Sequence, residues 1–356
     1  MSRKAKKKKN GFSKFLIFID ICALICFFLA YGPISFFRNI LITTAMTTME
    51  HKYLAYILYD EDTVKEVLAN NRIIESGEST DTSAINTELA KDTGSYESIY
   101  EEQILKREEG QKYKILDIEG KNWKGYMAVI YDPSEIELVF TKNYGKSRGA
   151  YISTMGKENN ALVAMTGSGV QHKNGVNYIT GSTIKDGKIY AVGKKINKGG
   201  GMIGFTKDNV LVLTNKTAQQ AIDEYNMDRA VEFGPFLIVN GKPSTFSGSG
   251  DGVHPRTAIA QRQDGIVLFV VIEGRRASSV GISLKDLSEF FLKYKAYNAA
   301  NLDGGGSSAL YAVVNGKGKL LNEPGGYNYS GERYMANAWM LIPREEEKEI
   351  ATKGEE

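Results

Sequence analysis

A hairpin predicted around Asp264-Gly265 constrains the fold more than any other feature of the sequence. Apolar runs precede and follow this dipeptide, which is typical of two-residue turns between antiparallel strands. With these two residues as the turn, Gln263 opposes Ile266, and Arg256 is expected to face Glu273 across the hairpin. A cross-strand ion pair with a purely structural role is the alternative interpretation of that pair.

The residues after the hairpin predict a helix and then a third strand. Ser283–Lys295 has the spacing of an amphipathic helix, with Ser283 as its N-cap and Asp286 at the third position. The run Asn298–Leu302 follows as a strand. A strand, a helix and a strand of one sheet form a right-handed crossover, so the strands that end at Glu273 and Asp303 are expected to run parallel.

These strands are expected to bring three charged residues to one edge of a sheet. Glu273 and Asp303 follow the carboxyl ends of parallel strands, where open α/β sheets bind their ligands. Arg256 is expected at the same edge through the hairpin. After Asp303 the chain continues with three glycines and two serines, Gly304 to Ser308. Consecutive glycines are costly in backbone entropy, and they make sense where a ligand approaches the main chain or N–H groups converge on an anion.

The surrounding sequence predicts a β-rich domain. From about Tyr113 onward, short apolar or alternating runs are separated by Gly, Asn and Asp, and Lys185-Asp186-Gly187 is a second hairpin signal. One helix is expected from Thr217 to Asn226. We therefore predict an α+β or mixed α/β catalytic domain over residues 113–343, with a mixed sheet and a βαβ crossover.

The N-terminal residues predict a membrane anchor. Residues 1–38 contain eight Lys or Arg and one acid, whereas the whole chain has a net charge of +3, so the remainder is net acidic and shows no nucleic-acid-binding character. The apolar run 15–37 is long enough to cross a bilayer, and the basic residues 1–14 are expected to stay in the cytoplasm. A cleaved signal peptide is the alternative, but the run is long for one and no clear cleavage site follows.

The other segments complete the expected organisation. We predict a helical stalk over residues 38–70, a polar linker over 71–112 and a charged tail over 344–356. Cys22 and Cys26 both lie in the apolar run, so the exported part contains no cysteine and no disulfide. This pattern favours a single-pass protein of a bacterial cell envelope, with its catalytic domain extracellular.

The residues at the predicted edge suit a substrate that carries both a sugar and a phosphate. Two neighbouring carboxyl groups are the usual groups for cleaving a glycosidic bond. An arginine beside them adds a planar fork for a phosphate. The chain has three His, so a His-based metal site or a serine triad is disfavoured. Ser307 and Ser308 are interpreted as capping residues rather than nucleophiles.

Several of these motifs together resemble the phosphodiester glycosidase family, which includes the animal N-acetylglucosamine-1-phosphodiester α-N-acetylglucosaminidase, the uncovering enzyme, and bacterial exopolysaccharide-associated proteins. The resemblance covers roughly residues 113–343. It rests on Pro255 to Ala260, the run VVIEGR, the run NLDGGGSSAL and residues 331–338, GERYMANA.

The resemblance implies hydrolysis of a sugar-1-phosphodiester at its glycosidic bond. The expected catalytic residues are Asp303, Glu273 and Arg256, and the expected substrate-binding residues are Gly304, Gly305, Gly306, Ser307, Ser308, Thr257, His254, Thr166, Arg333 and Asn337. Two positions depart from the family pattern. Residues 164–169, AMTGSG, lack the Asn and the aromatic pair of the family's early motif, and Glu273 stands where relatives commonly have Asp.

We therefore predict a membrane-anchored hydrolase that acts on a glycan or sugar-phosphate of the cell envelope. The sequence leaves open a non-catalytic envelope protein on the same fold that binds or assembles glycans, which the altered Thr166 segment favours. A metal-dependent phosphodiesterase with an all-oxygen Mg²⁺ or Ca²⁺ site is a further alternative. No cofactor and no dedicated metal ligands are expected, and the sequence does not predict an oligomeric state.

Overall fold

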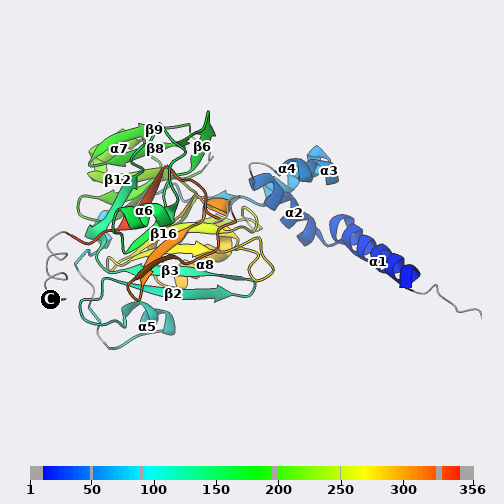
Figure 1. The fold of residues 1–356 in the computed structure, drawn as a ribbon, viewed down its shortest axis with the longest axis horizontal. Coiled ribbons are helices and arrows are strands. Elements are labelled where there is room, and N and C mark those ends of the chain that lie inside the picture. Colours follow the sequence, from blue (N-terminus) through cyan, green and yellow to red (C-terminus); the bar gives the residue numbers. More distant parts are fainter. Residues whose placement is uncertain are drawn as a thin grey trace, which may run out of the picture. The chain divides into compact units, whose positions relative to one another are not determined.

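The computed structural model describes residues 11–48, 51–88, 91–92, 94–194, 199–248, 250–325 and 331–344 (Figure 1). The chain forms two compact units, Met1–Arg72 and Ile73–Glu356. The basic segment 1–10 and almost all of the charged tail predicted over 344–356 lie outside the described residues.

The described residues of the N-terminal unit form four helices: α1 (Gly11–Tyr31), α2 (Ser35–Thr47), α3 (Tyr53–Leu58) and α4 (Glu61–Asn70). The stretch Ser13–Tyr31 is long and apolar enough to cross a membrane. The apolar run 15–37, predicted to span the membrane, is not one continuous helix, because α1 ends at Tyr31, before Gly32-Pro33. A proline lacks an N–H donor and disfavours helical geometry in the residue before it, so α2 begins anew at Ser35.

The segment 38–70, expected as a stalk, is a small packed bundle. Helices α2, α3 and α4 share one apolar core, formed by Ile42, Ala45, Ala55, Tyr59, Val64 and Val67. The carboxylate of Asp60 caps α4 by accepting from the N–H of Thr63 at 2.7 Å.

Much of the segment 71–112, which we expected to be a polar linker, lies along the C-terminal unit. It contains β1 (Ile73–Ile74), which pairs with β15 (Thr245–Phe246), the short helix η1 (Thr82–Ala84) and α5 (Ile99–Leu105). The carboxylate of Glu75 accepts from the N–H of Phe236 at 2.6 Å and from that of Gly200 at 2.9 Å. Backbone bonds from Thr80 and Asn86 fasten the segment further along.

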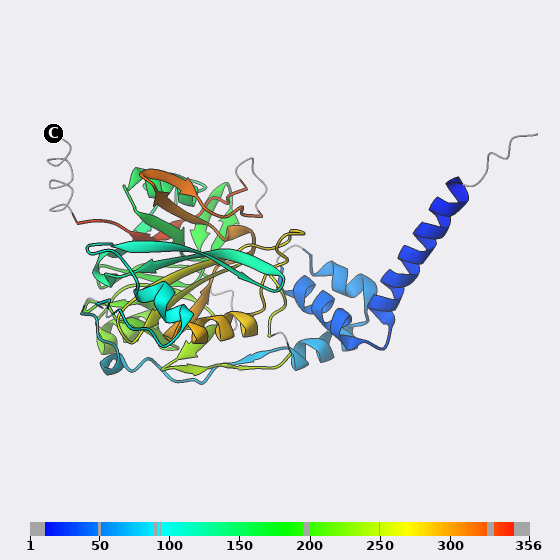
Figure 2. The same cartoon turned by 90° about the horizontal axis from the view of Figure 1, so that it is seen from below.

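A seven-stranded sheet lies at the centre of this unit, in the order β14-β13-β18-β16-β17-β3-β2. Its strands are β2 (Tyr113–Gly120), β3 (Trp123–Ile130), β13 (Phe236–Val239), β14 (Lys242–Pro243), β16 (Arg256–Arg262), β17 (Val267–Ile272) and β18 (Ala296–Leu302). The predicted helix is α8 (Leu284–Lys293), which packs along one face of the sheet (Figure 2). Ser283 caps it as predicted, because its hydroxyl accepts from the N–H of Asp286 at 3.1 Å.

A second sheet has five strands in the order β20-β19-β5-β21-β4. They are β4 (Ile136–Phe140), β5 (Val163–Thr166), β19 (Leu310–Val314), β20 (Lys317–Leu320) and β21 (Asn337–Leu341), and they lie near the helices η2 (Pro133–Glu135) and α6 (Ile152–Glu158). Trp339 is fully buried in the main core, together with side chains from the seven-stranded sheet such as Phe269 and Leu302.

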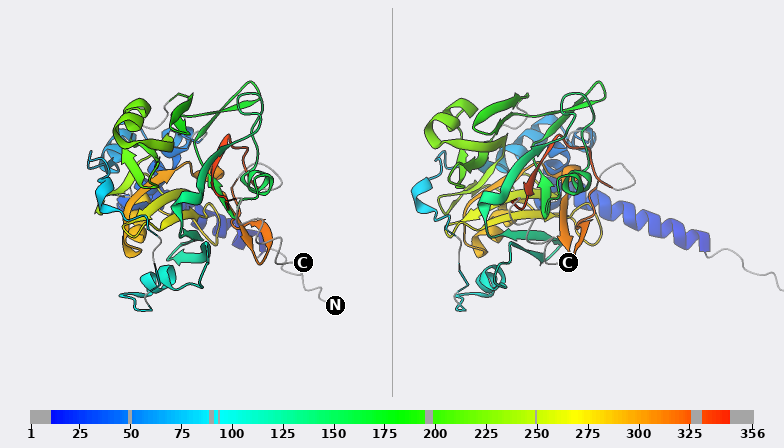
Figure 3. Two further views of the ribbon diagram at one scale, coloured as in Figure 1. Left: turned by 90° about the vertical axis from the view of Figure 1, so that its left-hand side faces the viewer. Right: turned by 60° about the vertical axis from the view of Figure 1, so that its left-hand side comes forward.

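A third sheet, in the order β11-β10-β12-β8-β9, completes the domain. Its strands are β8 (Ser182–Lys185), β9 (Lys188–Val192), β10 (Gly201–Thr206), β11 (Leu211–Thr214) and β12 (Met227–Phe233), with α7 (Ala218–Tyr225) beside them in Figure 3. Asp186 and Gly187 both have positive φ, which confirms the second predicted hairpin turn. The strands β6 (Val170–Lys173) and β7 (Val176–Ile179) form a separate hairpin. The predicted fold class, a β-rich mixed α/β domain with a βαβ crossover, is confirmed.

Candidate active site

The candidate site lies at the edge of the seven-stranded sheet where β17 and β18 end and β16 begins. Thr257 on β16 opposes both Val271 on β17 and Leu302 on β18. Since β16 is antiparallel to each of them, β17 and β18 are parallel, as the crossover predicted. The backbones of Arg256, Glu273 and Asp303 therefore meet at one edge.

The hairpin register differs from the prediction by one residue. Gln261 opposes Val267 and Arg256 opposes Ile272, so Arg256 does not face Glu273. The turn has three residues because Gly265 takes a left-handed conformation, with φ of 82°, while Asp264 does not. The N–H of Arg262 closes the turn by donating to the carbonyl of Ile266 at 3.0 Å. A shift of one residue moves a side chain to the other face of a strand, which separates the two groups that we expected to pair.

Arg256 is buried and binds the loop before its own strand. Its guanidinium lies 3.3 Å from the carboxylate of Asp251 and donates to the carbonyls of Asp251, Gly252 and Ile282 at 3.1–3.4 Å. Burial lowers the pKa of Arg256 and raises that of Asp251. The contacts in the described structure thus give Arg256 a scaffolding position, and its catalytic role stays a prediction.

His254, a predicted substrate-binding residue, is also buried. Its backbone forms an isolated bridge with Ile282. Burial, together with the positive charges of Arg256 and Arg275, lowers the pKa of its imidazole to about 3. The ring is therefore neutral at physiological pH.

Asp303 follows the last residue of β18 and is partly accessible. Burial raises the pKa of its carboxyl to about 6, although a hydrogen bond from Ser307 and the positive charge of Arg333 oppose this rise. Arg333 also donates to the hydroxyl of Ser307 at 3.5 Å. The structure thus brings together three predicted site residues, Asp303, Ser307 and Arg333, around a carboxyl that titrates near neutral pH.

Two arginines flank the glycine loop after Asp303, which includes the short helix η3 (Gly305–Ser307). Gly305 has φ of 61°, and a Cβ at this position would lie 3.3 Å from a terminal nitrogen of Arg275. A Cβ at Gly306 would lie 3.5 Å from Cδ of Arg333. Any side chain at Gly305 would therefore crowd the guanidinium of Arg275, so glycine keeps this approach open.

Arg275 was absent from the predicted site residues, although it belongs to the run VVIEGR. It is exposed, it has φ of 60°, and it lies on the loop that leaves β17. Its place two residues after Glu273, at the end of a strand that enters the site, was the signal that could have found it.

Other predicted substrate-binding residues are buried and position the loops of the site. The hydroxyl of Thr166 donates to the carbonyl of Ser307 at 2.5 Å and accepts from the N–H of Ala309 at 3.2 Å. The amide of Asn337 accepts from the N–H of Ser168 at 2.7 Å and donates to its hydroxyl at 2.9 Å. Two further predicted residues are also buried, with hydroxyls that have no hydrogen-bond partner in the described structure: Thr257 and Ser308.

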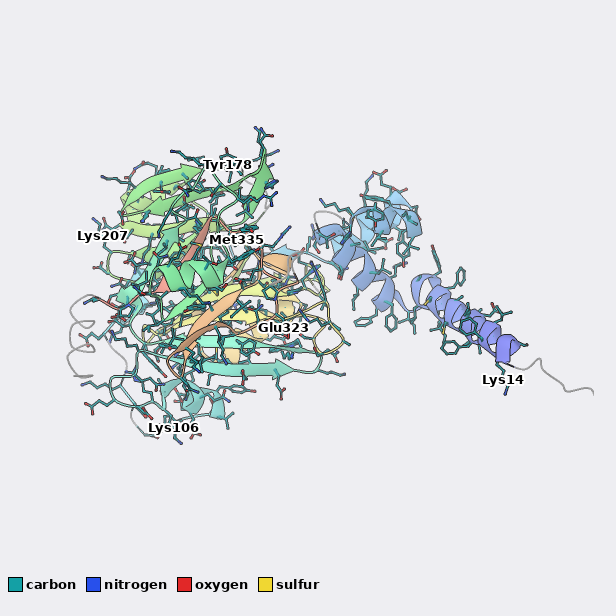
Figure 4. The ribbon with its side chains drawn as sticks, in the orientation of Figure 1. Lys14, Lys106, Tyr178, Lys207, Glu323 and Met335 are labelled. Atoms are coloured by element: carbon teal, nitrogen blue, oxygen red, sulfur yellow. The ribbon has the colours of Figure 1, made fainter. Side chains whose placement is uncertain are left out.

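Glu273 supports a neighbouring loop. Its buried carboxylate accepts from the N–H of Glu323, labelled in Figure 4, at 3.1 Å and lies 3.6 Å from the ammonium group of Lys124. The loop continues to Gly325, whose carbonyl oxygen would lie 3.3 Å from a Cβ at Gly306. Among the described residues, no group of three or more His, Cys, Asp or Glu is placed to hold a metal ion.

Comparison with known proteins identifies the family of this site. Residues 159–342 match the family described as phosphodiester glycosidase, and this range includes Thr166, Glu273, Arg275, Asp303 and Arg333. The chain belongs to the phosphodiester glycosidase family. The strands β2, β3 and β4 lie outside the matched range, yet they extend two of the sheets of this phosphodiester glycosidase domain.

Its relatives are distant. The SPbeta prophage-derived uncharacterized protein YomE of Bacillus subtilis is 30% identical over 193 residues, which cover 50% of this chain and 28% of that protein. The N-acetylglucosamine-1-phosphodiester alpha-N-acetylglucosaminidase of Bos taurus is 26% identical over 151 residues, which cover 36% of this chain and 28% of the bovine protein. The chain thus spans under a third of the length of these curated relatives.

A solved structure supports the fold of the phosphodiester glycosidase domain. The catalytic domain of zebrafish N-acetylglucosamine-1-phosphodiester alpha-N-acetylglucosaminidase, in a form auto-inhibited by its pro-peptide, superposes with a TM-score of 0.54 at 20% identity. The match covers 67% of this chain and 86% of the zebrafish chain.

Proposed function

We propose that this chain is a membrane-anchored hydrolase that cleaves the glycosidic bond of a sugar-1-phosphodiester in a cell-envelope glycan. The observation that carries this proposal is the carboxyl of Asp303. Its pKa is raised to about 6, it accepts a hydrogen bond from Ser307, the positive charge of Arg333 acts on it, and it adjoins a glycine loop that Arg275 also approaches. Membership of the phosphodiester glycosidase family supports a hydrolase-like activity.

The proposed reaction assigns one step to the carboxylate. Water adds to C1 of the sugar, while the bond from C1 to the phosphate oxygen breaks and its electron pair leaves with that oxygen. The water loses a proton, which the ionised Asp303 accepts. The products are the free sugar and a phosphate monoester. The pKa of Asp303 near 6 leaves this base largely ionised at neutral pH.

Arg275 and Arg333, the two arginines that flank the glycine loop, would hold the phosphate. A guanidinium group presents a planar fork of donors that matches two phosphate oxygens and stays charged at every relevant pH. Arg275 lies against Gly305 and Arg333 lies against Gly306, so both can reach an anion that rests on the loop. The leaving phosphate would then depart as a stabilised anion without needing a proton.

The catalytic role of Glu273 stays a prediction. In the proposed site it has a separate task, because its carboxylate holds the N–H of Glu323 and thereby the loop that reaches Gly306.

The anchoring part of the proposal rests on α1. The stretch Ser13–Tyr31 has a mean hydropathy of 2.3 and none of it is buried inside the protein. Six of the eight basic residues of the N-terminal segment precede it, at positions 3–9. By the positive-inside rule, this arrangement supports a cytoplasmic N-terminus and a catalytic domain on the other side of the membrane.

The test uses the full chain in detergent and a methyl phosphodiester of N-acetylglucosamine 1-phosphate, the bond named for the bovine relative. Release of free N-acetylglucosamine is measured for the wild type, for Asp303→Asn and for Asp208→Asn, an exposed carboxylate in the turn between β10 and β11. Turnover that is lost in the first variant and kept in the second supports the proposal.

Other outcomes identify the alternatives. Binding of the sugar phosphodiester without turnover in any of the three proteins would favour a non-catalytic glycan-binding protein. Release of a sugar phosphate that stops when a chelator is added would favour a metal-dependent phosphodiesterase, because that reaction breaks a phosphorus–oxygen bond and leaves the glycosidic bond intact.

A further inference from the structure

The short helix α3 exposes an apolar face that the rest of its unit does not cover. Four large side chains, Tyr53, Leu54, Tyr56 and Ile57, are 41–69% exposed, whereas Ala55 on the opposite side of the helix is buried in the core of the bundle. We call these four residues the α3 apolar face. At 100° per residue they occupy one side of the helix. No charged residue occurs within α3.

Two hydrogen bonds fasten α3 to the end of the spanning helix. The hydroxyl of Tyr31, the last residue of α1, donates to the carbonyl of Leu58 at 2.7 Å. The hydroxyl of Tyr59 donates to the carbonyl of Ala30 at 2.9 Å. The rings of Tyr31 and Tyr59 also lie in contact, with 5.7 Å between their centroids. The C-terminal end of α3 is thus held beside the last turn of α1.

This attachment sets the depth of α3 in a membrane. The 19 residues of Ser13–Tyr31 span about 29 Å at 1.5 Å per residue, close to the thickness of the hydrocarbon core. Tyr31 therefore lies where the hydrocarbon gives way to the headgroups. Tyrosine is enriched at that level, because its ring is apolar and its hydroxyl reaches polar groups.

The start of α2 is apolar in the same zone. Ile34, Phe36 and Phe37 follow Tyr31 by at most six residues and are all exposed. By contrast, α4 exposes the charged residues Glu61, Asp62, Lys65 and Glu66. The bundle thus has an apolar side next to the spanning helix and a charged helix that suits water, the division of an interfacial membrane-binding element.

We propose that the α3 apolar face inserts into the headgroup boundary of the membrane that α1 crosses. The ligand is the lipid bilayer itself, and the proposal rests on the anchoring part of the proposed function. With two points of attachment, α1 and α3, the bundle cannot rotate freely about the axis of the spanning helix.

The experiment places one nitroxide label at a time on the full chain in vesicles of phosphatidylcholine and phosphatidylglycerol. Both native cysteines, Cys22 and Cys26, lie in α1, so Cys22→Ala with Cys26→Ala gives a cysteine-free background. Labels are attached at Ile57→Cys and at the control Lys65→Cys on α4. A third sample keeps Cys22 and carries the label there as a reference for the membrane interior. Collision rates with oxygen and with a water-soluble nickel complex report the depth of each label.

The ratio of oxygen to nickel collisions is expected to be several-fold higher at position 57 than at position 65. Equal ratios at 57 and 65, with a high ratio at 22, would overturn the insertion of α3 and leave the anchor intact. A low ratio at all three positions would overturn the anchor and the insertion together. Protection of position 57 from both reagents would show a protein contact, such as a second copy of the chain, and would also overturn the proposal.

Discussion

Arg333 donates a hydrogen bond to the hydroxyl of Ser307 at 3.5 Å, and both residues act on the carboxyl of Asp303. Each of them lowers the pKa of that carboxyl, while burial raises it by more, so the value settles at about 6. The balance matters for catalysis, because a carboxyl that titrates near neutral pH can change its protonation state during a reaction at little cost.

The pH profile of kcat/KM is expected to have a limb near pH 6. If the ionised Asp303 accepts the proton of water, kcat/KM falls as the pH drops below about 6, where the carboxyl becomes neutral. Arg333→Met removes a cation that favours the ionised form, so the limb is expected to move to higher pH. The measurement is kcat/KM from pH 4.5 to 8 for both proteins. A rate that instead increases as the pH falls through 6 would identify Asp303 as an acid.

The same carboxyl is expected to destabilise the fold at neutral pH. The pKa of Asp303 is raised from 3.8 in its ordinary state to about 6, so between these values the folded protein holds more protons than the unfolded chain. Stability contributed by the neutral form is therefore lost as the pH rises through this window. Asp303→Asn is expected to raise the free energy of unfolding at pH 7 by about 1–3 kcal/mol, with little effect near pH 4.

Urea denaturation at pH 4 and pH 7 checks this expectation. Asp208→Asn is the matched control, because it makes the same chemical change at an exposed residue away from the site. If Asp303→Asn were as stable as the control at both pH values, the carboxyl would not be strained by its burial.

The local elements of the fold could be predicted from the sequence because short-range patterns determine them. The apolar spacing and the cap at Ser283 predicted α8, and the alternating runs predicted β16, β17 and β18. The parallel relation of β17 and β18 followed from the crossover rule. These inferences need only neighbouring residues and general chirality, so they placed Asp303 and Glu273 at the correct edge of the sheet.

Side-chain directions could not be predicted in the same way. The hairpin register depends on whether Asp264 and Gly265 both take positive φ or only Gly265 does. Both outcomes fit an Asp-Gly pair. The burial of Arg256 depends on Asp251 and Ile282, which come from loops whose course the sequence does not state. Likewise, the approach of Arg275 to Gly305 is a tertiary contact with no local signature.

The scaffolding position of Arg256 leads to a prediction about stability. Arg256→Ala leaves the partly accessible Asp251 without its cation and leaves three carbonyls without their donor, so the free energy of unfolding is expected to fall by about 3–5 kcal/mol. Arg256→Lys keeps the charge but lacks the fork for four acceptors, so it is expected to recover only part of the loss. Urea denaturation measures both. A stable Arg256→Ala variant that has lost activity would instead indicate that Arg256 acts on the substrate.

Arg275 and Arg276 offer a matched pair for testing the phosphate site. Arg275 lies against Gly305, whereas Arg276 binds Glu323, whose carboxylate lies at 2.5 Å and whose carbonyl accepts at 3.0 Å. Arg275→Gln is expected to lower kcat/KM by about 10- to 100-fold, as expected for one charged hydrogen-bonding group worth roughly 1.5–3 kcal/mol. Arg276→Gln keeps the same net charge as Arg275→Gln but is expected to lower kcat/KM less, because Arg276 acts on the site through Glu323 rather than at Gly305. Equal losses in the two variants would show that general charge, rather than a fork at Gly305, attracts the phosphate.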